Sequence, residues 1–214
     1  MKKLKVLIAD DHDLMRRGIK ALIESQDSWI VCAEARTGRE AVDKAESTKP
    51  DVAIIDISMP ELNGIDAARR IKAVVPRTEV LILSIHYSDQ VVRDVINSGI
   101  RGFVVKSDSE RDLVMAVEAL SKHRAFFTPL ATQAMLNNLE KPEEAEPAET
   151  RLTTREREIL QLLSEGKSSK EVASVLNISV KTAETHRSNL MGKLGLHNVS
   201  ELVRYAVRNR IIQI

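Results

Sequence analysis

The sequence predicts an α/β protein whose N-terminal part is a doubly wound, five-stranded parallel sheet, followed by a second, smaller all-α domain with a helix-turn-helix. Three observations predict this. Short apolar runs alternate with helical patterns five times in the first 120 residues. Each run is nearly continuous in apolar residues, as expected for parallel strands that are covered on both faces. After residue 151, four compact helical patterns follow, each with a start signal.

The expected strands are β-branched or Leu-rich and end at polar residues. They are Lys5–Ala9, Val31–Ala35, Val52–Ile55, Val80–Leu83 and Gly102–Val105. The segments between and after them have helical spacing of their apolar residues. These expected helices are Leu14–Glu24, Arg39–Glu46, Ile65–Val74, Ser88–Asn97 and Glu110–Ser121.

A change in composition separates this region from the rest of the chain. The segment Pro129–Leu139 is expected to form a short helix, and residues 140–150 contain five Glu, two Pro and no large apolar residue. Prolines interrupt helices, so this acidic stretch is predicted to be a solvated linker. The predicted organisation is an α/β domain over residues 1–122, a linker over 123–150 and a helical domain over 151–214.

The helical domain carries explicit helix boundaries. Capping boxes, or their Asn variant, start three helices, and Ser179 is the N-cap candidate of a fourth. The capping pairs are Thr153 with Glu156, Ser168 with Glu171, and Asn198 with Glu201. Gly166 and Gly195 stand where helices should stop. Helices over Ser168–Leu176 and Val180–Leu194, joined by three residues, have the outline of a helix-turn-helix.

Charge and composition exclude several classes of protein. The chain has 32 basic and 31 acidic residues, but residues 151–214 alone carry 11 basic and 6 acidic residues, which suggests a polyanionic partner for that domain. Aromatic residues make up only 3%, which argues against stacking on single-stranded nucleic acid. The single Cys32 permits no intrachain disulfide. The longest apolar runs have five residues and no secretory signal is recognisable, so we expect a cytoplasmic protein without membrane association.

Polar residues follow four of the predicted strands. Asp10 and Asp11 come after the first strand, Asp56 after the third, Ser84 after the fourth and Lys106 after the fifth. Because parallel strands end at one edge of a sheet, these side chains should share one crevice. Three carboxylates repel one another and suit a hard cation such as Mg²⁺. A carboxylate can itself accept a phosphoryl group, and Lys106 with Mg²⁺ would neutralise that group's charge.

These residues resemble the receiver domain of bacterial two-component response regulators over about residues 4–121. The matching motifs are Asp10-Asp11, Asp56-Ile-Ser-Met-Pro60-Glu-Leu-Asn-Gly64, Ser84 and Gly102-Phe-Val-Val-Lys106. The resemblance implies a flavodoxin-like fold and phosphorylation of Asp56 by a sensor histidine kinase. It also implies Mg²⁺ held by Asp11, Asp56 and the backbone carbonyl of Ser58, with Asp10 acting through water.

The same resemblance assigns a switch. Ser84 and Phe103 would form the switch pair, and Lys106 would bind the phosphoryl group. Phe103 lacks the hydroxyl of the Tyr that is often found at this position, so the switch should depend on burial of the ring alone. Gly64 is expected to supply a backbone turn before the next helix.

One face of the second helix of the helix-turn-helix is polar or small. At about 100° per residue, this face holds Lys181, Glu184, Thr185, Ser188 and Gly192. Recognition helices read base edges in the major groove of double-stranded DNA with their N-terminal half. Lys181, Arg187 and Lys193 could reach phosphates. The alternative is that this face is merely the solvated side of an amphipathic helix.

Residues 152–214 also resemble the LuxR-type domain of NarL/FixJ-like regulators. The resemblance rests on Leu152-Thr-Thr-Arg-Glu156, Gly166, Ser169-Lys-Glu-Val-Ala173, Ser179 to His186 and Lys193-Leu-Gly195. It implies base-edge contacts from Glu184, Thr185 and Ser188. It further implies DNA-backbone contacts from Lys181, Thr182, Arg187 and Lys193, and a homodimer on DNA when the protein is phosphorylated.

The sequence therefore predicts a DNA-binding transcriptional regulator of a phosphorelay and not an enzyme. One alternative is an aspartyl-phosphate-forming phosphohydrolase of the haloacid dehalogenase type, which uses Asp-x-Asp. Here Ser58 stands where the second Asp, the general acid, would be. The other alternative is a signalling adapter whose C-terminal helices bind protein, against which the basic helix face argues.

Overall fold

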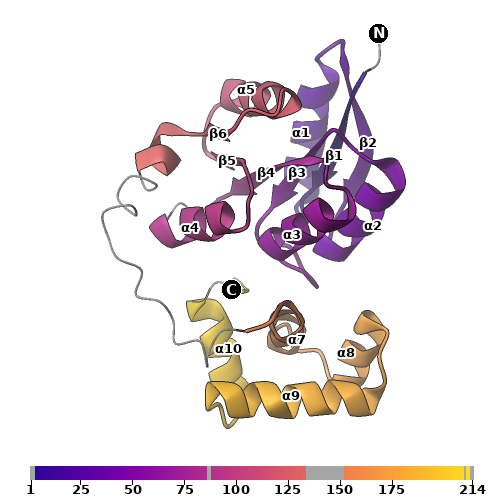
Figure 1. Cartoon of the computed structure of the whole chain (residues 1–214), viewed down its shortest axis with the longest axis vertical. Helices are drawn as coiled ribbons and strands as arrows, with labels where there is room; N and C mark the ends of the chain where they lie inside the picture. The colour runs from indigo at the N-terminus through magenta and orange to yellow at the C-terminus, as the bar shows by residue number, and fades with distance from the viewer. Residues whose placement is uncertain (1–2, 86–87, 134–151, 210, 213–214) are drawn as a thin grey trace. The chain divides into compact units, whose positions relative to one another are not determined.

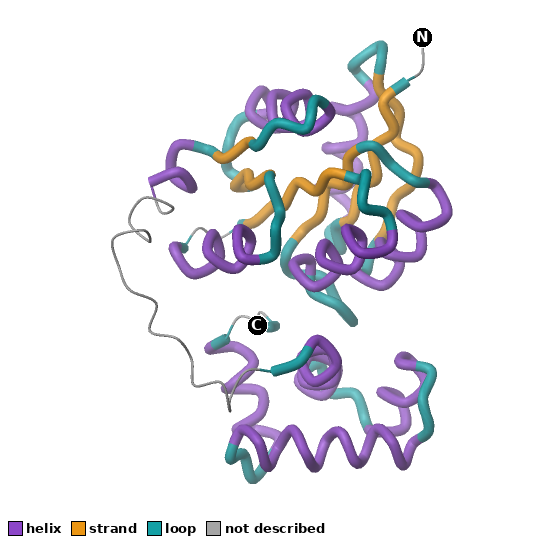
Figure 2. The backbone as a smooth tube through the Cα atoms, in the orientation of Figure 1, coloured by secondary structure: helices purple, strands orange, loops and turns teal. Residues whose placement is uncertain are grey.

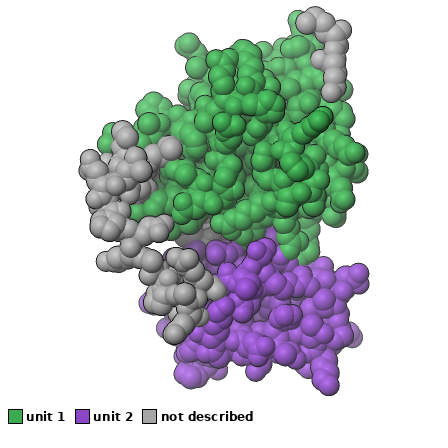
Figure 3. Space-filling view, viewed as in Figure 1, with its two compact units in different colours: residues 1–60, 64–142 green, residues 61–63, 143–214 purple. Residues whose placement is uncertain are grey.

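The structure is a computed structural model that describes residues 3–85, 88–133, 152–209 and 211–212. The chain divides into two compact units, coloured separately in Figure 3. The first consists mostly of residues 1–142 and the second mostly of residues 143–214.

The described part of the first unit contains a parallel six-stranded sheet in the order β2-β1-β3-β4-β5-β6. The strands are β1 (Leu4–Ala9), β2 (Trp29–Ala35), β3 (Val52–Asp56), β4 (Glu79–Ser84), β5 (Gly102–Val105) and β6 (Phe126–Phe127). The doubly wound parallel fold is confirmed, and its first five strands are the ones that the apolar runs predict.

The sixth strand was not expected, since residues 123–150 are assigned to the linker by composition. Phe126 and Phe127 pair in parallel with Gly102 and Phe103. Their two rings pack on opposite faces of the sheet, Phe127 with one core cluster and Phe126 with the other. A strand of two residues is too short to show alternation in the sequence, and only the neighbouring edge of β5 makes it a strand.

Helices α1 to α5 of the described part of the first unit cover the two faces of the sheet (Figures 1 and 2). They are α1 (Asp13–Glu24), α2 (Gly38–Thr48), α3 (Gly64–Val74), α4 (Asp89–Asn97) and α5 (Glu110–Ser121). Ile19 and Ile23 of α1 share a core cluster with Leu113 and Leu120 of α5. Apolar residues of α2, α3 and α4 form the cluster on the other face. Alternate strand residues serve the two clusters, which explains why both strand faces are apolar.

The described part of the second unit contains α7 (Thr154–Ser164), α8 (Ser169–Leu176), α9 (Val180–Leu194) and α10 (Val199–Arg208). Thr153 and Ser168 form complete capping boxes, while Ser179 and Asn198 accept backbone hydrogen bonds at the starts of α9 and α10. Gly166 and Gly195 have positive φ angles of 85° and 62°, as helix-ending glycines do. The predicted helix-turn-helix is thus present as α8 and α9, around one apolar core.

The expected helix Pro129–Leu139 is described only over residues 129–133, which are helical. Its remaining residues and the acidic stretch 140–150 lie outside the described residues. Among the described helices, none has the length and apolarity that a bilayer crossing requires.

Candidate functional site

Four strand ends of the first unit bring polar side chains to one edge of the sheet. Asp10 directly follows β1, Asp56 ends β3, Ser84 ends β4 and Lys106 directly follows β5. The Lys106 Nζ lies 2.8 Å from Asp10 Oδ2 and 2.9 Å from Asp56 Oδ1. The ammonium group thus joins two carboxylates that are 46 positions apart in the sequence.

Burial sets the electrostatics of this cluster. Asp10 and Asp56 are at most 1% exposed, and the Asp11 side chain is about one-third exposed. Burial raises the pKa of Asp56, an effect that the charge of Lys106 opposes and the charges of Asp10 and Asp11 reinforce. Burial by itself lowers the pKa of Lys106, but its hydrogen bond to Asp10 and the charge of Asp56 outweigh this and raise that pKa. Lys106 is therefore held as a cation against the phosphoacceptor candidate.

The cluster also has the ligand atoms of a cation site. Oxygen atoms of Asp10, Asp11 and Asp56 and a ring nitrogen of His12 all lie within 4.8 Å of one another. Asp56 Oδ2 is buried and accepts no hydrogen bond from any group in the described part of the chain. A buried carboxylate oxygen without a partner is costly, and a divalent cation would satisfy it. The residues present therefore fit a hard divalent cation.

The loop after Asp56 is shaped by a close backbone approach. A Cβ on Gly64 would lie 2.0 Å from the backbone carbonyl oxygen of Asp56 and 2.9 Å from the Cα of Ile57. The Gly64 N–H donates to the Ile57 carbonyl at 2.8 Å. Gly64 is not among the positive-φ residues, so the loop needs a glycine here for space and not for a left-handed backbone conformation. Ser58 lies in this same loop, two residues after Asp56.

The two expected switch residues sit on neighbouring strands. Ser84 at the end of β4 is 3% exposed, and Phe103 in β5 is fully buried. The Lys106 N–H donates to the Ser84 carbonyl at 2.7 Å, which connects the ends of β4 and β5. The Phe103 ring belongs to the core cluster under α2, α3 and α4, so any rearrangement of this residue has to disturb that core.

The sequence reasoning missed two residues that border the cluster, Arg16 of α1 and its N-cap residue His12. Arg16 is 5% exposed and donates to the Asp10 carbonyl at 2.8 Å, with Glu34 3.5 Å away and Asp13 also in contact. His12 Nδ1 lies 2.9 Å from Asp11 Oδ1. Arg16 precedes the buried Ile19 and Ile23 by three and seven positions, so its place on the apolar stripe of α1 was a usable signal.

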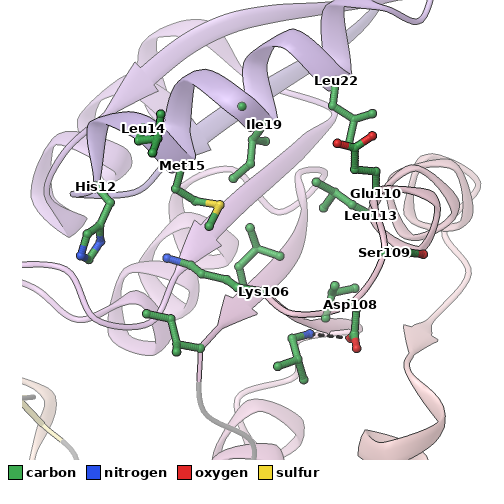
Figure 4. Close-up of a pocket in the computed structure, with 15 residues that line it drawn as sticks. His12, Leu14, Met15, Ile19, Leu22, Lys106, Asp108, Ser109, Glu110 and Leu113 are labelled. Carbon is green, nitrogen blue, oxygen red and sulfur yellow. Dashed lines mark hydrogen bonds between the residues drawn. The ribbon is translucent and has the colours of Figure 1, made fainter.

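A mostly apolar groove of about 430 Å³ lies beside the cluster, between α1 and the segment that leads into α5 (Figure 4). Leu14 and Met15 of α1 line it and are 86% and 37% exposed. Lys106, which contacts Asp10 and Asp56, also lines the groove. Exposed apolar surface of this kind beside a reactive group is typical of a contact surface for a partner protein.

In the second unit, α9 presents the predicted polar face to solvent. Lys181, Thr182, Glu184, Thr185 and Ser188 are exposed, while Arg187 and Lys193 are half-buried. Neither Glu184 nor its neighbours Lys181 and Arg187 form an ion pair within the described residues. Glu184 is therefore not held by an ion pair on the helix itself, and the exposure of this face is compatible both with DNA contact and with a merely solvated face.

Thr185 of this face and the nearby Lys193 have partners inside the unit. The Thr185 hydroxyl donates to the Lys181 carbonyl at 2.9 Å, and Lys193 Nζ lies 2.8 Å from Glu156 Oε2 of the α7 capping box. Lys193 therefore has to leave or share its carboxylate partner if it is to meet a DNA phosphate.

Two family models match the chain in the order of its two units. Residues 6–118 match the response regulator receiver domain, and residues 150–206 match the bacterial regulatory proteins of the luxR family. The response regulator protein VraR of Staphylococcus aureus is 35% identical over 210 residues, which cover 98% of this chain and 99% of that protein.

Two solved structures of response regulators also match the chain over most of its length. The RcsB response regulator of Salmonella typhimurium is 28% identical, with a TM-score of 0.63 over 98% of this chain and 99% of that one. RcsB from Salmonella enterica serovar Typhimurium, bound to a promoter in the presence of the phosphomimetic BeF3−, matches at 28% identity and a TM-score of 0.59, over 95% of this chain and 98% of that one. The chain therefore belongs to the two-component response regulators that join a receiver domain to a LuxR-type DNA-binding domain, and it is a transcription regulator and not an enzyme.

Proposed function

We propose that Asp56 accepts a phosphoryl group from the phosphohistidine of a sensor kinase, and that phosphorylation produces a homodimer that binds promoter DNA through α9. The observation that carries the first part is the position of Lys106, within 2.9 Å of Asp56 and 2.8 Å of Asp10 at the sheet edge. We place the reaction in the cytoplasm, with the kinase contacting the surface around the phosphoacceptor.

In the proposed step an Asp56 carboxylate oxygen attacks phosphorus, an oxygen–phosphorus bond forms, and the bond between phosphorus and the kinase imidazole breaks. Lys106 neutralises charge on the transferred group, because its raised pKa keeps it protonated beside Asp56. Asp10, Asp11 and Asp56, with the Ser58 carbonyl, would hold Mg²⁺, which when bound supplies further positive charge to the phosphoryl oxygens. Burial of Asp56 excludes bulk water from the attacking carboxylate.

The switch would follow from the same geometry. A phosphoryl group on Asp56 adds oxygens next to the end of β4, where the Ser84 hydroxyl could donate to one of them. Any movement of Ser84 transmits to β5, since the Lys106 N–H is bonded to the Ser84 carbonyl and Phe103 fills the adjacent core. We propose Ser84 and Phe103 as the residues that convert phosphorylation into a changed dimer surface.

For the second unit we propose that α9 lies in the major groove. Glu184, Thr185 and Ser188 are exposed on its N-terminal half and are placed to reach base edges. Lys181, Thr182, Arg187 and Lys193 are proposed to contact phosphates, where cations and hydroxyls position the protein without reading sequence.

The test is phosphorylation by acetyl phosphate with Mg²⁺, followed by DNA footprinting. We expect a hydroxylamine-labile phosphate on the wild-type protein and stronger protection of promoter DNA after labelling. Asp56→Asn should abolish both effects, whereas Asp27→Asn, a change at an exposed aspartate outside the cluster, should alter neither. Labelling that persists in Asp56→Asn would refute the phosphoacceptor assignment, and footprinting that ignores labelling would refute the coupling.

A further inference from the structure

The chain leaves the first unit through a segment that packs beside the proposed switch. After α5, residues 126–127 form β6 next to β5, and residues 129–133 follow as a short helical turn (Figures 1 and 2). The next residues that the structure describes belong to the second unit. We call residues 126–133 the exit segment, because it is the last described part of the first unit before the chain continues to α7.

The exit segment lies directly against Phe103. Phe127 pairs with Phe103 in parallel register, and Phe126 pairs with Gly102. Neighbouring strands are about 4.8 Å apart, and paired residues point their side chains to the same face of the sheet. Phe103 is fully buried in a core cluster that also contains Ala131 and against which Phe127 packs. A displacement of the Phe103 ring therefore takes packing away from the exit segment.

Two features weaken the docking of this segment. Its strand has only two residues, Phe126 and Phe127, so the ladder to β5 is short. Thr128 is 3% exposed, yet its hydroxyl has no hydrogen-bond partner in the part of the chain that the structure describes. A hydroxyl that is buried without a partner loses its hydrogen bonds to water, which favours the detached segment. Segments held in this way open locally at a lower cost than the core of the sheet.

We propose that phosphorylation releases the exit segment, which is docked on Phe103 while Asp56 is unmodified and detaches when the modified receiver moves the Phe103 ring. The inference rests on the proposed function, since it names a second structure that the proposed switch pair moves. Docking fixes the point at which the chain leaves the first unit, and release adds residues 126–133 to the tether of the second unit. A weakly held segment needs only a modest difference in its contacts with Phe103 to change its population.

The experiment measures hydrogen exchange of the exit segment by mass spectrometry in the full-length protein. Exchange is followed with Mg²⁺ alone and with Mg²⁺ and the phosphomimetic BeF3−, and labelling by acetyl phosphate reports separately on Asp56. Phe127→Ala removes the ring on the Phe103 side of the sheet. Phe126→Ala is the matched control, because it removes the same ring from the other face of the same strand. Thr128→Val removes the buried hydroxyl at nearly constant volume.

In the wild type we expect BeF3− to speed exchange of the exit segment about tenfold or more, because local opening limits the exchange of a docked segment. Phe126→Ala should speed exchange with and without BeF3− alike, so the ratio of the two rates keeps its wild-type value. Phe127→Ala should bring this ratio close to one, because the segment then no longer senses Phe103. Thr128→Val should slow exchange without BeF3− about fivefold or more, since no unpartnered hydroxyl opposes docking.

Exchange that ignores BeF3− in the wild type, or a wild-type ratio in Phe127→Ala, overturns the inference. All three variants should still accept phosphate from acetyl phosphate, so the proposed function then stands. If Phe127→Ala fails to fold, exchange in Thr128→Val that matches the wild type overturns the inference instead. Absence of labelling at Asp56 in the wild type would refute the proposed function, and the inference with it.

Discussion

Replacing Gly64 by alanine tests how closely the proposed phosphoacceptor, Asp56, depends on the loop that follows it. The added Cβ would meet the Asp56 carbonyl oxygen at 2.0 Å, the Asp56 carbonyl carbon at 2.8 Å and the Ile57 Cα at 2.9 Å. All three atoms belong to the backbone, so no side-chain rotation can relieve the clash. Real Cβ atoms essentially never approach closer than 3.0 Å, and the Asp56 backbone or the start of α3 must therefore move by about 1 Å.

Two consequences follow from that displacement. Overpacking a close-packed site destabilises by about 1–3 kcal/mol. A shift of about 1 Å in a reacting group can slow a reaction about 100-fold, because the attack geometry is lost. We therefore expect Gly64→Ala to lower the free energy of unfolding of the first unit by about 1–3 kcal/mol. We also expect labelling by acetyl phosphate to slow by about two orders of magnitude.

Gly18→Ala is the matched control, because a Cβ at Gly18 of α1 would meet nothing within 4 Å. Removing a glycine from a helix interior should stabilise the first unit by about 1 kcal/mol, opposite in sign to Gly64→Ala, and leave labelling unchanged. Urea unfolding followed by the fluorescence of Trp29 reports on the first unit, since this is the single tryptophan of the chain. If Gly64→Ala unfolds and labels like the wild type, the close approach at Asp56 does not constrain the site.

Four further substitutions test other contacts. Arg16→Met leaves the Asp10 carbonyl without its buried donor. The free energy of unfolding of the first unit, measured in urea, should therefore fall by about 1–3 kcal/mol, and Mg²⁺ should bind more weakly. Unchanged Mg²⁺ affinity would show that Arg16 does not position the acidic cluster. Burial by itself would raise the pKa of Glu156, but hydrogen bonds from Lys193 and Thr153 outweigh it and lower that pKa below the ordinary value of 4.5. The ionised Glu156 therefore stabilises the folded state above pH 4.5, and this stabilisation is lost as the pH falls through the folded-state pKa. Hydrogen exchange in α7 should therefore show Glu156→Gln less stable than the wild type by about 1 kcal/mol at pH 7 and similar to it near pH 3, and a difference that persists at low pH would contradict the assignment. Lys181→Ala should weaken binding to all DNA sequences and reduce the slope of log affinity against log salt concentration by about one unit. Glu184→Ala should instead weaken the binding free energy by about 1–3 kcal/mol on the preferred site only. If site selection returns identical preferences for Glu184→Ala and wild type, Glu184 reads no base.

The sequence by itself determined the order of elements and the position of the main site. Parallel strands covered on both faces leave continuous apolar runs, so the strands could be located from local composition. Their common direction then placed Asp10, Asp56, Ser84 and Lys106 at one edge, and the distances around Lys106 agree. Helix starts in the second unit were equally predictable, because capping boxes are local signals within four residues.

Only the tertiary structure decided the features that depend on chain segments far apart in sequence. The sixth strand exists because Phe126 and Phe127 meet the free edge of β5. Gly64 is required because its α-carbon approaches the Asp56 carbonyl, not because its own φ angle is unusual. Lys193 is paired with Glu156, 37 positions earlier, although its place on α9 indicated only a phosphate contact. His12 joins the acidic cluster through the orientation of its ring, which no periodicity encodes. Composition and spacing report on what each residue's own segment does, whereas close approach between segments depends on how the whole chain packs.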